Sequence, residues 1–161
     1  MPAGALGDTP KSSTDFTVTS TAFVNNGAIP ADYTCDGLVI PPPLSWSRPP
    51  ANTRSLAILV EDPDAPQGPF THWLVTNIPP TMTSLTAGLP HEAFEANNDK
   101  GTLGYTGPCP PSGTHRYVFR VYALDVAIPR ATSKADFLYK ASGHMLAMGE
   151  LVGTYTHMST R

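Results

Sequence analysis

Residues 55–78 read SLAILVEDPDAPQGPFTHWLVTNI, and this stretch decides the fold that we expect. Two apolar runs, at residues 55–60 and 73–78, have the length and composition of buried β-strands. The loop between them is rich in acids and prolines and leads to His72. Because proline fixes φ near about −65° and lacks a backbone donor, this loop can hold a defined side-chain geometry. Ionisable groups on a rigid loop at the end of a core strand predict a functional site.

A second loop and strand have the same construction. Residues 104–124 read GYTGPCPPSGTHRYVFRVYAL, a stiff loop that leads into a strand. Side chains alternate between the two faces of a strand, so His115 and Tyr117 share one face at its start. We therefore expect both loops to contribute to one site.

The length and composition favour one mainly β domain. A chain of 161 residues with 40% hydrophobic residues is long enough for one sizeable core. Its 18 prolines and 13 glycines, spread among short apolar runs, favour a sandwich or barrel over a helical bundle. Residues 1–14 are rich in Pro, Gly, Ser and Thr without periodicity, so we interpret them as a flexible tail and residues 15–161 as a single domain.

The charge excludes some partners. A net charge of −3 and the lack of a Lys/Arg-rich run give no reason to expect nucleic acid. Residues 1–10 lack the pattern of a secretory signal, and no run has membrane-spanning length. We therefore expect a cytoplasmic protein without integral membrane contact. A signal removed before residue 1 would leave no trace, so export stays open.

Short helices are expected near the C-terminus. Ser133 and Asp136 have the spacing of a capping box, and apolar residues follow at helical intervals up to Ala141. A second apolar-periodic segment follows at residues 144–151, and residues 152–156 return to strand character.

The candidate site residues from the two loops are Asp62, Asp64, His72, His115 and Tyr117. Serine hydrolysis is disfavoured, because the only serine within either motif is Ser112, on a turn, and a nucleophile elbow is absent. A phosphate-binding loop of the Gly-x-x-x-x-Gly-Lys-Ser/Thr type is also absent.

Two other interpretations of the histidines stay open from the residues alone. His72 and His115 with one aspartate could form a facial metal triad and make the protein a metal-dependent enzyme. Alternatively, both histidines could simply be hydrogen-bonded residues at strand ends.

The same motifs carry a resemblance to a known family. The Asp-Pro-Asp-Ala-Pro run at residues 62–66 with His72 after it, Gly107-Pro108, and the later His-Arg-Tyr at residues 115–117 resemble the phosphatidylethanolamine-binding protein family. Two long motifs in the right order make this resemblance specific.

The resemblance covers the chain from about Phe16 to Tyr155. The short segment from Gln67 to Thr71 is similar to the bacterial and archaeal branch, often called Raf-kinase-inhibitor-like. The family implies an antiparallel β-sandwich with short peripheral helices near the C-terminus, which agrees with the composition.

The resemblance also implies a function. It implies a non-catalytic binding module with a small pocket for phosphate or phosphorylated head groups such as phosphoethanolamine, with no cofactor and no metal. The implied ligand-binding residues are Asp62, His72, Gly107, His115 and Tyr117, and the implied pocket wall is Asp64, Pro66 and Pro108. An alternative role is inhibition of a kinase or a serine protease through a surface loop. A homodimer stays open.

Physical roles follow for the implied pocket. Histidine nitrogens and the Tyr117 hydroxyl donate to phosphate oxygens, and Gly107 lets a backbone amide approach the anion. Asp62 repels a dianion, so it orients a histidine, holds it protonated, or binds an ammonium group. We expect its charge to outweigh burial and to raise the histidine pKa.

The sequence also raises two questions of covalent structure, the state of the two cysteines and the isomer of one proline bond. Cys35 and Cys109 are either two buried thiols or, as family members with cysteines in both places suggest, a disulfide between two loops that stiffens the pocket wall. The resemblance further implies a cis bond between Ala65 and Pro66.

Overall fold

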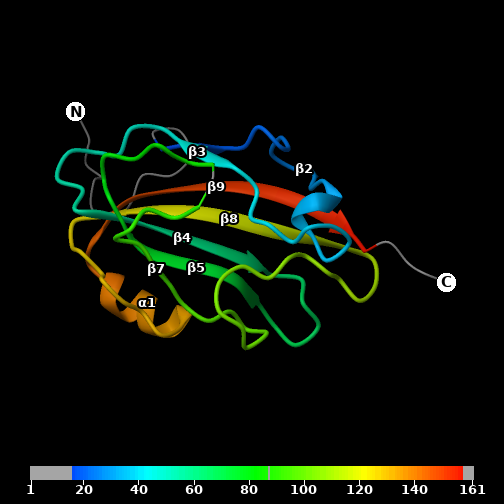
Figure 1. The fold of residues 1–161 in the computed structure, drawn as a ribbon. Helices are drawn as coiled ribbons and strands as arrows, with labels where there is room; N and C mark the ends of the chain where they lie inside the picture. Colours follow the sequence, from blue (N-terminus) through cyan, green and yellow to red (C-terminus); the bar gives the residue numbers. More distant parts are fainter. Residues whose placement is uncertain (1–15, 87, 158–161) are drawn as a thin grey trace.

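The structure, a computed structural model, describes residues 16–86 and 88–157. The strands form a three-stranded and a six-stranded sheet, and a single α-helix is found among the described residues (Figure 1). The elements are β1 (Val18–Thr19), β2 (Gly27–Ala28), the 3-10 helix η2 (Ala31–Tyr33), β3 (Leu44–Trp46), β4 (Ser55–Asp62), β5 (Phe70–Ile78), β6 (Ser84–Leu85), β7 (Phe94–Glu95), β8 (Thr114–Leu124), α1 (Lys134–Ala141) and β9 (Met145–Thr156).

The fold is the expected mainly β sandwich. The large sheet has the order β2-β9-β8-β4-β5-β7 and the small sheet the order β1-β3-β6. All pairs are antiparallel except β2 with β9, a short parallel pair at one edge. The predicted tail at residues 1–14 lies outside the described residues. No described helix has both the length and the apolar character that a membrane crossing requires.

The strand predicted at residues 55–60 lies at the centre of the large sheet and is buried on both faces. Leu56, Ile58 and Val60 pack in the core between the two sheets. Ala57 and Leu59 face the opposite way, into a second core beneath α1. In Figure 1 the small sheet and α1 accordingly lie on opposite sides of the large sheet. This double coverage explains why β4 is a continuous apolar run instead of an alternating one.

Half of the predicted capping box is confirmed at the start of α1, because Ser133 is the N-cap but the Asp136 carboxylate accepts from the Thr132 N–H and not from that of Ser133. Ser133 is extended, and its side-chain oxygen accepts a hydrogen bond from the Asp136 backbone N–H. The helix buries Phe137 and Ala141 in the second core, where the Phe137 ring contacts that of Tyr122 edge-on at 5.3 Å. The cap and this apolar face together account for the helix.

The second helical segment expected at residues 144–151 is wrong, because β9 runs as one strand over Met145–Thr156. It pairs with β8 along that strand's whole length. Gly149 permits close packing, since a Cβ there would lie only 2.5 Å from the Phe16 carbonyl oxygen. Cross-strand pairing and packing thus override the local helical pattern.

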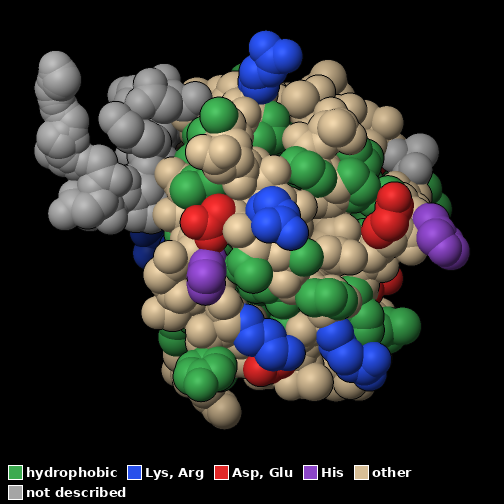
Figure 2. Space-filling model, turned by 90° about the vertical axis from the view of Figure 1, so that its left-hand side faces the viewer, with side chains coloured by type: hydrophobic (Ala, Val, Ile, Leu, Met, Phe, Trp, Pro, Cys, Tyr) green, Lys and Arg blue, Asp and Glu red, His purple; other side chains and the backbone are tan. Residues whose placement is uncertain are grey.

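The order of strands brings the two motif loops to one end of the large sheet. β4 lies between β5 and β8, and it ends where both of these begin. Figure 2 views the molecule from the other end, where basic and acidic side chains are interspersed on the visible surface. The two motif loops lie at the opposite end of the large sheet, which this view does not show.

Candidate functional site

A pocket of about 520 Å³ lies at the loop end of the large sheet. Its wall combines the ends of β4, β5 and β8 with the segments around the two cysteines. The structure brings together in this wall six of the residues singled out from the sequence, namely Asp62, Pro66, His72, Gly107, His115 and Tyr117. That they bind a ligand stays a prediction.

His72, on β5, is fixed to the neighbouring loop from both its ring and its backbone. Its Nδ1 donates to the Thr106 carbonyl oxygen at 2.6 Å, and the Thr106 N–H donates to the His72 carbonyl at 3.0 Å. The ring also contacts Tyr117 edge-on at 5.3 Å. With Nδ1 engaged in this way, only Nε2 of the imidazole is left for a ligand.

Burial lowers the pKa of His72 below its usual value. The hydrogen bond to Thr106 and the charge of Asp62 oppose this shift but do not overcome it. The expectation that the carboxylate would prevail is therefore wrong for His72, because the imidazole lies deeper than a pocket open to water suggested. His72 is a neutral acceptor at Nε2 around neutral pH.

Asp62 connects the first loop to His115. Its Oδ2 accepts a hydrogen bond from His115 Nδ1 at 2.6 Å, and its Oδ1 accepts from the Asp64 backbone N–H at 2.7 Å. Both side chains of the Asp62–His115 pair are at most 10% exposed. Of the roles considered for Asp62, this geometry supports orientation of a histidine, and it leaves Nε2 of His115 for a ligand.

Tyr117 lies between the two imidazoles. Its ring stacks on His115 at 6.4 Å and meets the edge of His72. Its hydroxyl is enclosed and makes no hydrogen bond of good geometry with the described residues, although Asp62 and the Cys109 backbone lie close enough to act on it. Burial raises the pKa of Tyr117, and the Asp62 charge adds to this. A buried hydroxyl without a partner is costly unless a ligand or water satisfies it.

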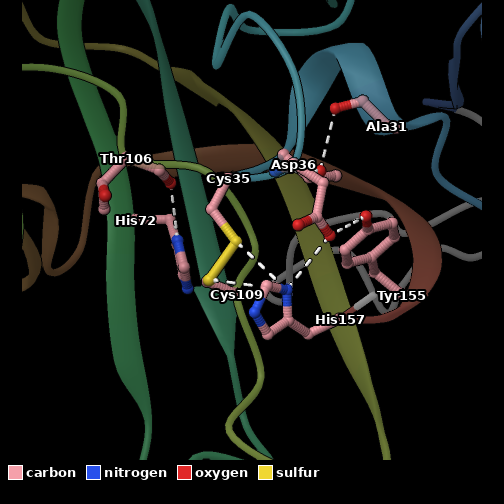
Figure 3. The surroundings of a disulfide bond; sticks show 9 residues. Ala31, Cys35, Asp36, His72, Thr106, Cys109, Tyr155 and His157 are labelled. Carbon is pink, nitrogen blue, oxygen red and sulfur yellow. Dashed lines mark hydrogen bonds and ion pairs between the residues drawn. A yellow bond between two sulfur atoms is a disulfide. The ribbon is translucent and has the colours of Figure 1, made fainter. Parts of the chain in front are cut away.

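The wall opposite β5 is formed by two loops held together in several ways. Cys35 and Cys109 form a disulfide (Figure 3), which resolves the two alternatives left open by the sequence. The Cys35 N–H donates to the Pro108 carbonyl at 3.1 Å. A Cβ on Gly107 would lie 2.9 Å from the Thr34 Cα, so glycine is required for this close approach.

Two residues expected in the wall do not line the pocket. Asp64 instead binds Arg116, with its carboxylate accepting from the Arg116 backbone N–H at 2.9 Å and from the guanidinium at 3.0 and 2.8 Å. This pair lowers the pKa of Asp64 to about 2. Pro108 contributes its carbonyl to the contact with Cys35 and does not line the pocket either.

The cis Ala65–Pro66 bond implied by the resemblance is wrong, since the described residues contain no cis peptide. The turn is made differently. Gly68 has a φ of 108°, and its N–H donates to the Ala65 carbonyl at 3.1 Å. A β-turn centred on Pro66 and Gln67, followed at once by a glycine at positive φ, thus turns the chain without a cis bond.

The pocket also contains residues that the sequence analysis missed. Lys100 brings a positive charge to its rim, and Phe70 adds an aromatic ring that contacts His72 at 4.9 Å. The loop of Lys100 is held by the buried Asn98, whose side-chain amide donates to the Gly104 carbonyl at 2.8 Å. A lone lysine in a polar stretch carries no motif, so no sequence signal pointed to it.

The geometry offers little support for a metal triad of the two histidines and one aspartate. Among the described residues, Asp62, His72 and His115 are not a group whose ligand atoms all lie within 4.8 Å of one another. One oxygen of Asp62 is already bound to His115. His115 is hydrogen-bonded to Asp62, whereas His72 is hydrogen-bonded to the Thr106 carbonyl and is not joined to the pair.

A β-sandwich with a partly enclosed pocket at one end, lined by apolar side chains and a few polar ones, defines the class of protein, a β-sandwich binding protein. The sequence matches the phosphatidylethanolamine-binding protein family over residues 19–156. The chain therefore belongs to this family, as the two loop motifs indicated.

Relatives and solved structures agree with this assignment. A UPF0098 protein of Methanothermobacter thermautotrophicus is 50% identical over 142 residues, which cover 83% of this chain and 94% of that protein. The crystal structure of a phosphatidylethanolamine-binding protein homologue from Chlamydia trachomatis matches with a TM-score of 0.83 and 40% identity, over 89% of this chain and 98% of that one. The crystal structure of Escherichia coli YbcL, described as a new member of the mammalian family, matches with a TM-score of 0.82 and 34% identity, over 89% of this chain and 99% of that one.

Proposed function

We propose that the pocket binds a small phosphorylated ligand that still carries a hydrogen-bond donor, such as a phosphate monoester or a phosphoethanolamine head group. One observation supports this most strongly. Each of the two imidazoles uses Nδ1 to donate to a protein oxygen, and no described residue hydrogen-bonds to either Nε2. Two fixed nitrogens in one pocket are thus left for the ligand.

The protonation state of His72, whose pKa is lowered by burial, favours phosphate over other anions. A neutral imidazole whose Nδ1 carries the proton can only accept at Nε2. A phosphate monoester has a second pKa near about 6, so it can keep a P–OH group that donates to such an acceptor. Sulfate cannot keep a proton under these conditions. The pocket is therefore expected to discriminate between two oxyanions of similar size.

The charges of the pocket suit a zwitterionic head group. Lys100 at the rim attracts the phosphate, while the Asp62 carboxylate offers a compensating negative charge for an ammonium group. The Tyr117 hydroxyl would gain the partner that it lacks among the described residues. A volume of about 520 Å³ is within the range of small-molecule sites and suits a head group.

We further propose that binding is not followed by a reaction. The described residues place no serine in the pocket wall, and its two cysteines are joined to each other. Ser112 is exposed on its turn. The histidines therefore have no serine or free thiol in the pocket wall to activate as a nucleophile.

The test is calorimetric titration at pH 7 with phosphoethanolamine, inorganic phosphate and sulfate. We expect sulfate to bind at least about tenfold more weakly than phosphate, and Tyr117→Phe to lose about tenfold in phosphate affinity because it removes one hydroxyl donor to a charged group. Tyr139→Phe, at an exposed tyrosine on α1, is the matched control and should leave affinity unchanged.

The proposal is wrong if sulfate binds as tightly as phosphate, or if no ligand gives heat or a rise in melting temperature. A turnover of the phosphate ester during the titration would contradict the non-catalytic role. Elemental analysis of the same protein sample tests the alternative of a metal-dependent enzyme. That alternative requires one equivalent of metal bound at the histidines.

A second candidate function is docking to a partner protein, as in inhibition of a kinase or serine protease. The observation that favours it is the exposed apolar run Leu38, Val39 and Ile40, of which Val39 also lines the pocket. Such a run at a pocket rim is a common feature of protein-binding surfaces. If inhibition of a partner is found, Leu38→Ser should abolish it while phosphate affinity is retained.

A further inference from the structure

A cluster of metal-ligating side chains lies beside the disulfide, on the side away from His72 (Figure 3). The Nδ1 of His157 is 3.5 Å from the Cys35 sulfur and 3.9 Å from the Cys109 sulfur. The Oδ2 of Asp36 lies 3.1 Å from the same nitrogen and also accepts from the Tyr155 hydroxyl. Cys35 and Cys109 also line the pocket described above, whereas His157 and Asp36 do not, so this cluster adjoins the proposed ligand site from outside.

The distances in this cluster match those between the ligands of a tetrahedral zinc ion. Zn–S bonds of about 2.3 Å and Zn–N bonds of about 2.0–2.1 Å place a sulfur and a nitrogen ligand about 3.5 Å apart. They place two sulfurs about 3.8 Å apart, which requires only that the disulfide bond be broken and the sulfurs separate. Among the described residues, Cys35, Cys109 and His157 form a group of potential metal ligands whose ligand atoms all lie within 4.8 Å of one another.

We propose that reduction of the disulfide creates a site for Zn²⁺ or another thiolate-binding divalent cation, with Cys35, Cys109, His157 and Asp36 as its ligands. Two thiolates, an imidazole and a carboxylate are ligands that zinc accepts in a closed tetrahedral site. The proposal is independent of the function proposed for the pocket.

Reduction of the Cys35–Cys109 disulfide to two thiols takes two electrons and two protons, which a dithiol or a phosphine in water can supply. A dithiol gives two electrons and two protons to the disulfide and is itself oxidised to a disulfide. A phosphine is oxidised to its oxide, with water supplying the oxygen and the two protons. The cation then displaces one proton from each thiol and binds His157 as a neutral imidazole, through Nδ1 with the ring proton on Nε2. Binding therefore releases the two thiol protons and weakens as the pH falls.

The site would be preorganised after reduction, because other contacts hold the two loops together. The Cys35 N–H donates to the Pro108 carbonyl at 3.1 Å. The Tyr105 hydroxyl donates to the Tyr33 carbonyl at 2.6 Å, and Gly107 allows the backbones to touch. The sulfurs therefore stay near each other and near His157 when their bond is broken. The metal would replace the disulfide as the cross-link wherever the surroundings are reducing.

The experiment compares oxidised and reduced full-length protein. The protein is reduced with a water-soluble phosphine, freed of it without air, and titrated with Co²⁺ and then with Zn²⁺ against a chromogenic chelator. We expect one equivalent to bind to the reduced protein, with the charge-transfer absorption of cobalt thiolate and the d–d bands of tetrahedral Co²⁺. The oxidised protein should give neither signal.

Variants identify the ligands. His157→Ala and Asp36→Asn should each weaken Zn²⁺ binding by about tenfold or more. His144→Ala is the matched control, because His144 is also a partly exposed histidine 2.8 Å from an aspartate but is not part of the cluster. Circular dichroism of each reduced variant shows that the fold is retained.

The proposal is overturned if the reduced wild type binds no cobalt, or if His157→Ala binds as tightly as the wild type. It is also overturned if the oxidised protein gives the same cobalt spectrum, because the sulfurs would then not be ligands.

Discussion

His115 Nδ1 donates a hydrogen bond to Asp62 Oδ2 across 2.6 Å, within the protein interior. The second oxygen of the carboxylate accepts from the Asp64 backbone N–H, so one side chain fixes both the histidine and the loop. The carboxylate sets which nitrogen of His115 carries the proton and which is left without a protein partner.

We expect Asp62→Asn to lower the free energy of unfolding at pH 7 by about 1.5–3 kcal/mol, because it removes a buried hydrogen bond to a charged group. It should also reduce the affinity for phosphoethanolamine more than that for phosphate, since only the former has an ammonium group. Urea denaturation and calorimetry measure these effects. The control is Asp125→Asn, at an exposed aspartate 2.8 Å from His144, where a loss below about 0.5 kcal/mol is expected. Equal losses at both sites would contradict the role given to Asp62.

The lowered pKa of His72 predicts a loss of stability in acid. Because the folded-state pKa lies below the usual value of 6.5, the unfolded chain binds the proton more readily than the folded protein. Stability is therefore full above about pH 6.5 and declines as the pH falls towards the folded-state pKa. Urea denaturation between about pH 5 and 8 measures this slope.

His72→Asn is the informative variant for this prediction, because the Asn amide can still donate to Thr106 but does not titrate. Its stability should change less with pH than that of the wild type. Added phosphate should reduce the acid loss in the wild type, because a bound anion stabilises the imidazolium. An unchanged slope in His72→Asn would show that another group is responsible.

Lys100 is expected to attract the anion at the pocket rim. Lys100→Gln should weaken phosphate binding by about two- to fivefold at low salt, the range for an exposed charge pair, and less at high salt, because ions screen the interaction. Lys140→Gln on α1 removes the same charge far from the pocket and should have no effect. If both variants weaken binding equally, net charge and not the position of Lys100 is responsible.

Asp64 is expected to act on stability and not on the ligand, since its carboxylate binds Arg116 outside the pocket. Its pKa falls from 3.8 to about 2, so the stabilisation is present above about pH 3.8 and is lost as the pH falls through about 2. Asp64→Asn should therefore be slightly less stable than the wild type at pH 7, with the difference shrinking between those two values. Calorimetry should show unchanged phosphate affinity, and a loss like that of Asp62→Asn would contradict this assignment.

The sequence was sufficient where a local pattern has one physical meaning. The apolar run at residues 55–60 predicted a buried strand, and Ser133 and Asp136 marked the start of α1. The period of two placed His115 and Tyr117 on one face, and the structure puts both in the same pocket.

Other features depend on contacts between distant residues and could not be predicted. The segment at residues 144–151 is periodic like a helix, but pairing with β8 makes it a strand. The pKa of His72 depends on how deeply the fold buries it. The position of Lys100 depends on the loop held by Asn98, and the partner of Asp64 depends on strand register.

The pairing of β8 with both β4 and β9 limits how this binding site can change in evolution. Inserting or deleting one residue early in β8 would turn His115 and Tyr117 to the opposite face of the sheet while the strand itself survives. Such a change would leave a folded protein without its pocket. New specificities are therefore expected to arise through the lengths of the loops around residues 63–69 and 97–113, whereas the strand that carries the two aromatic side chains keeps its length.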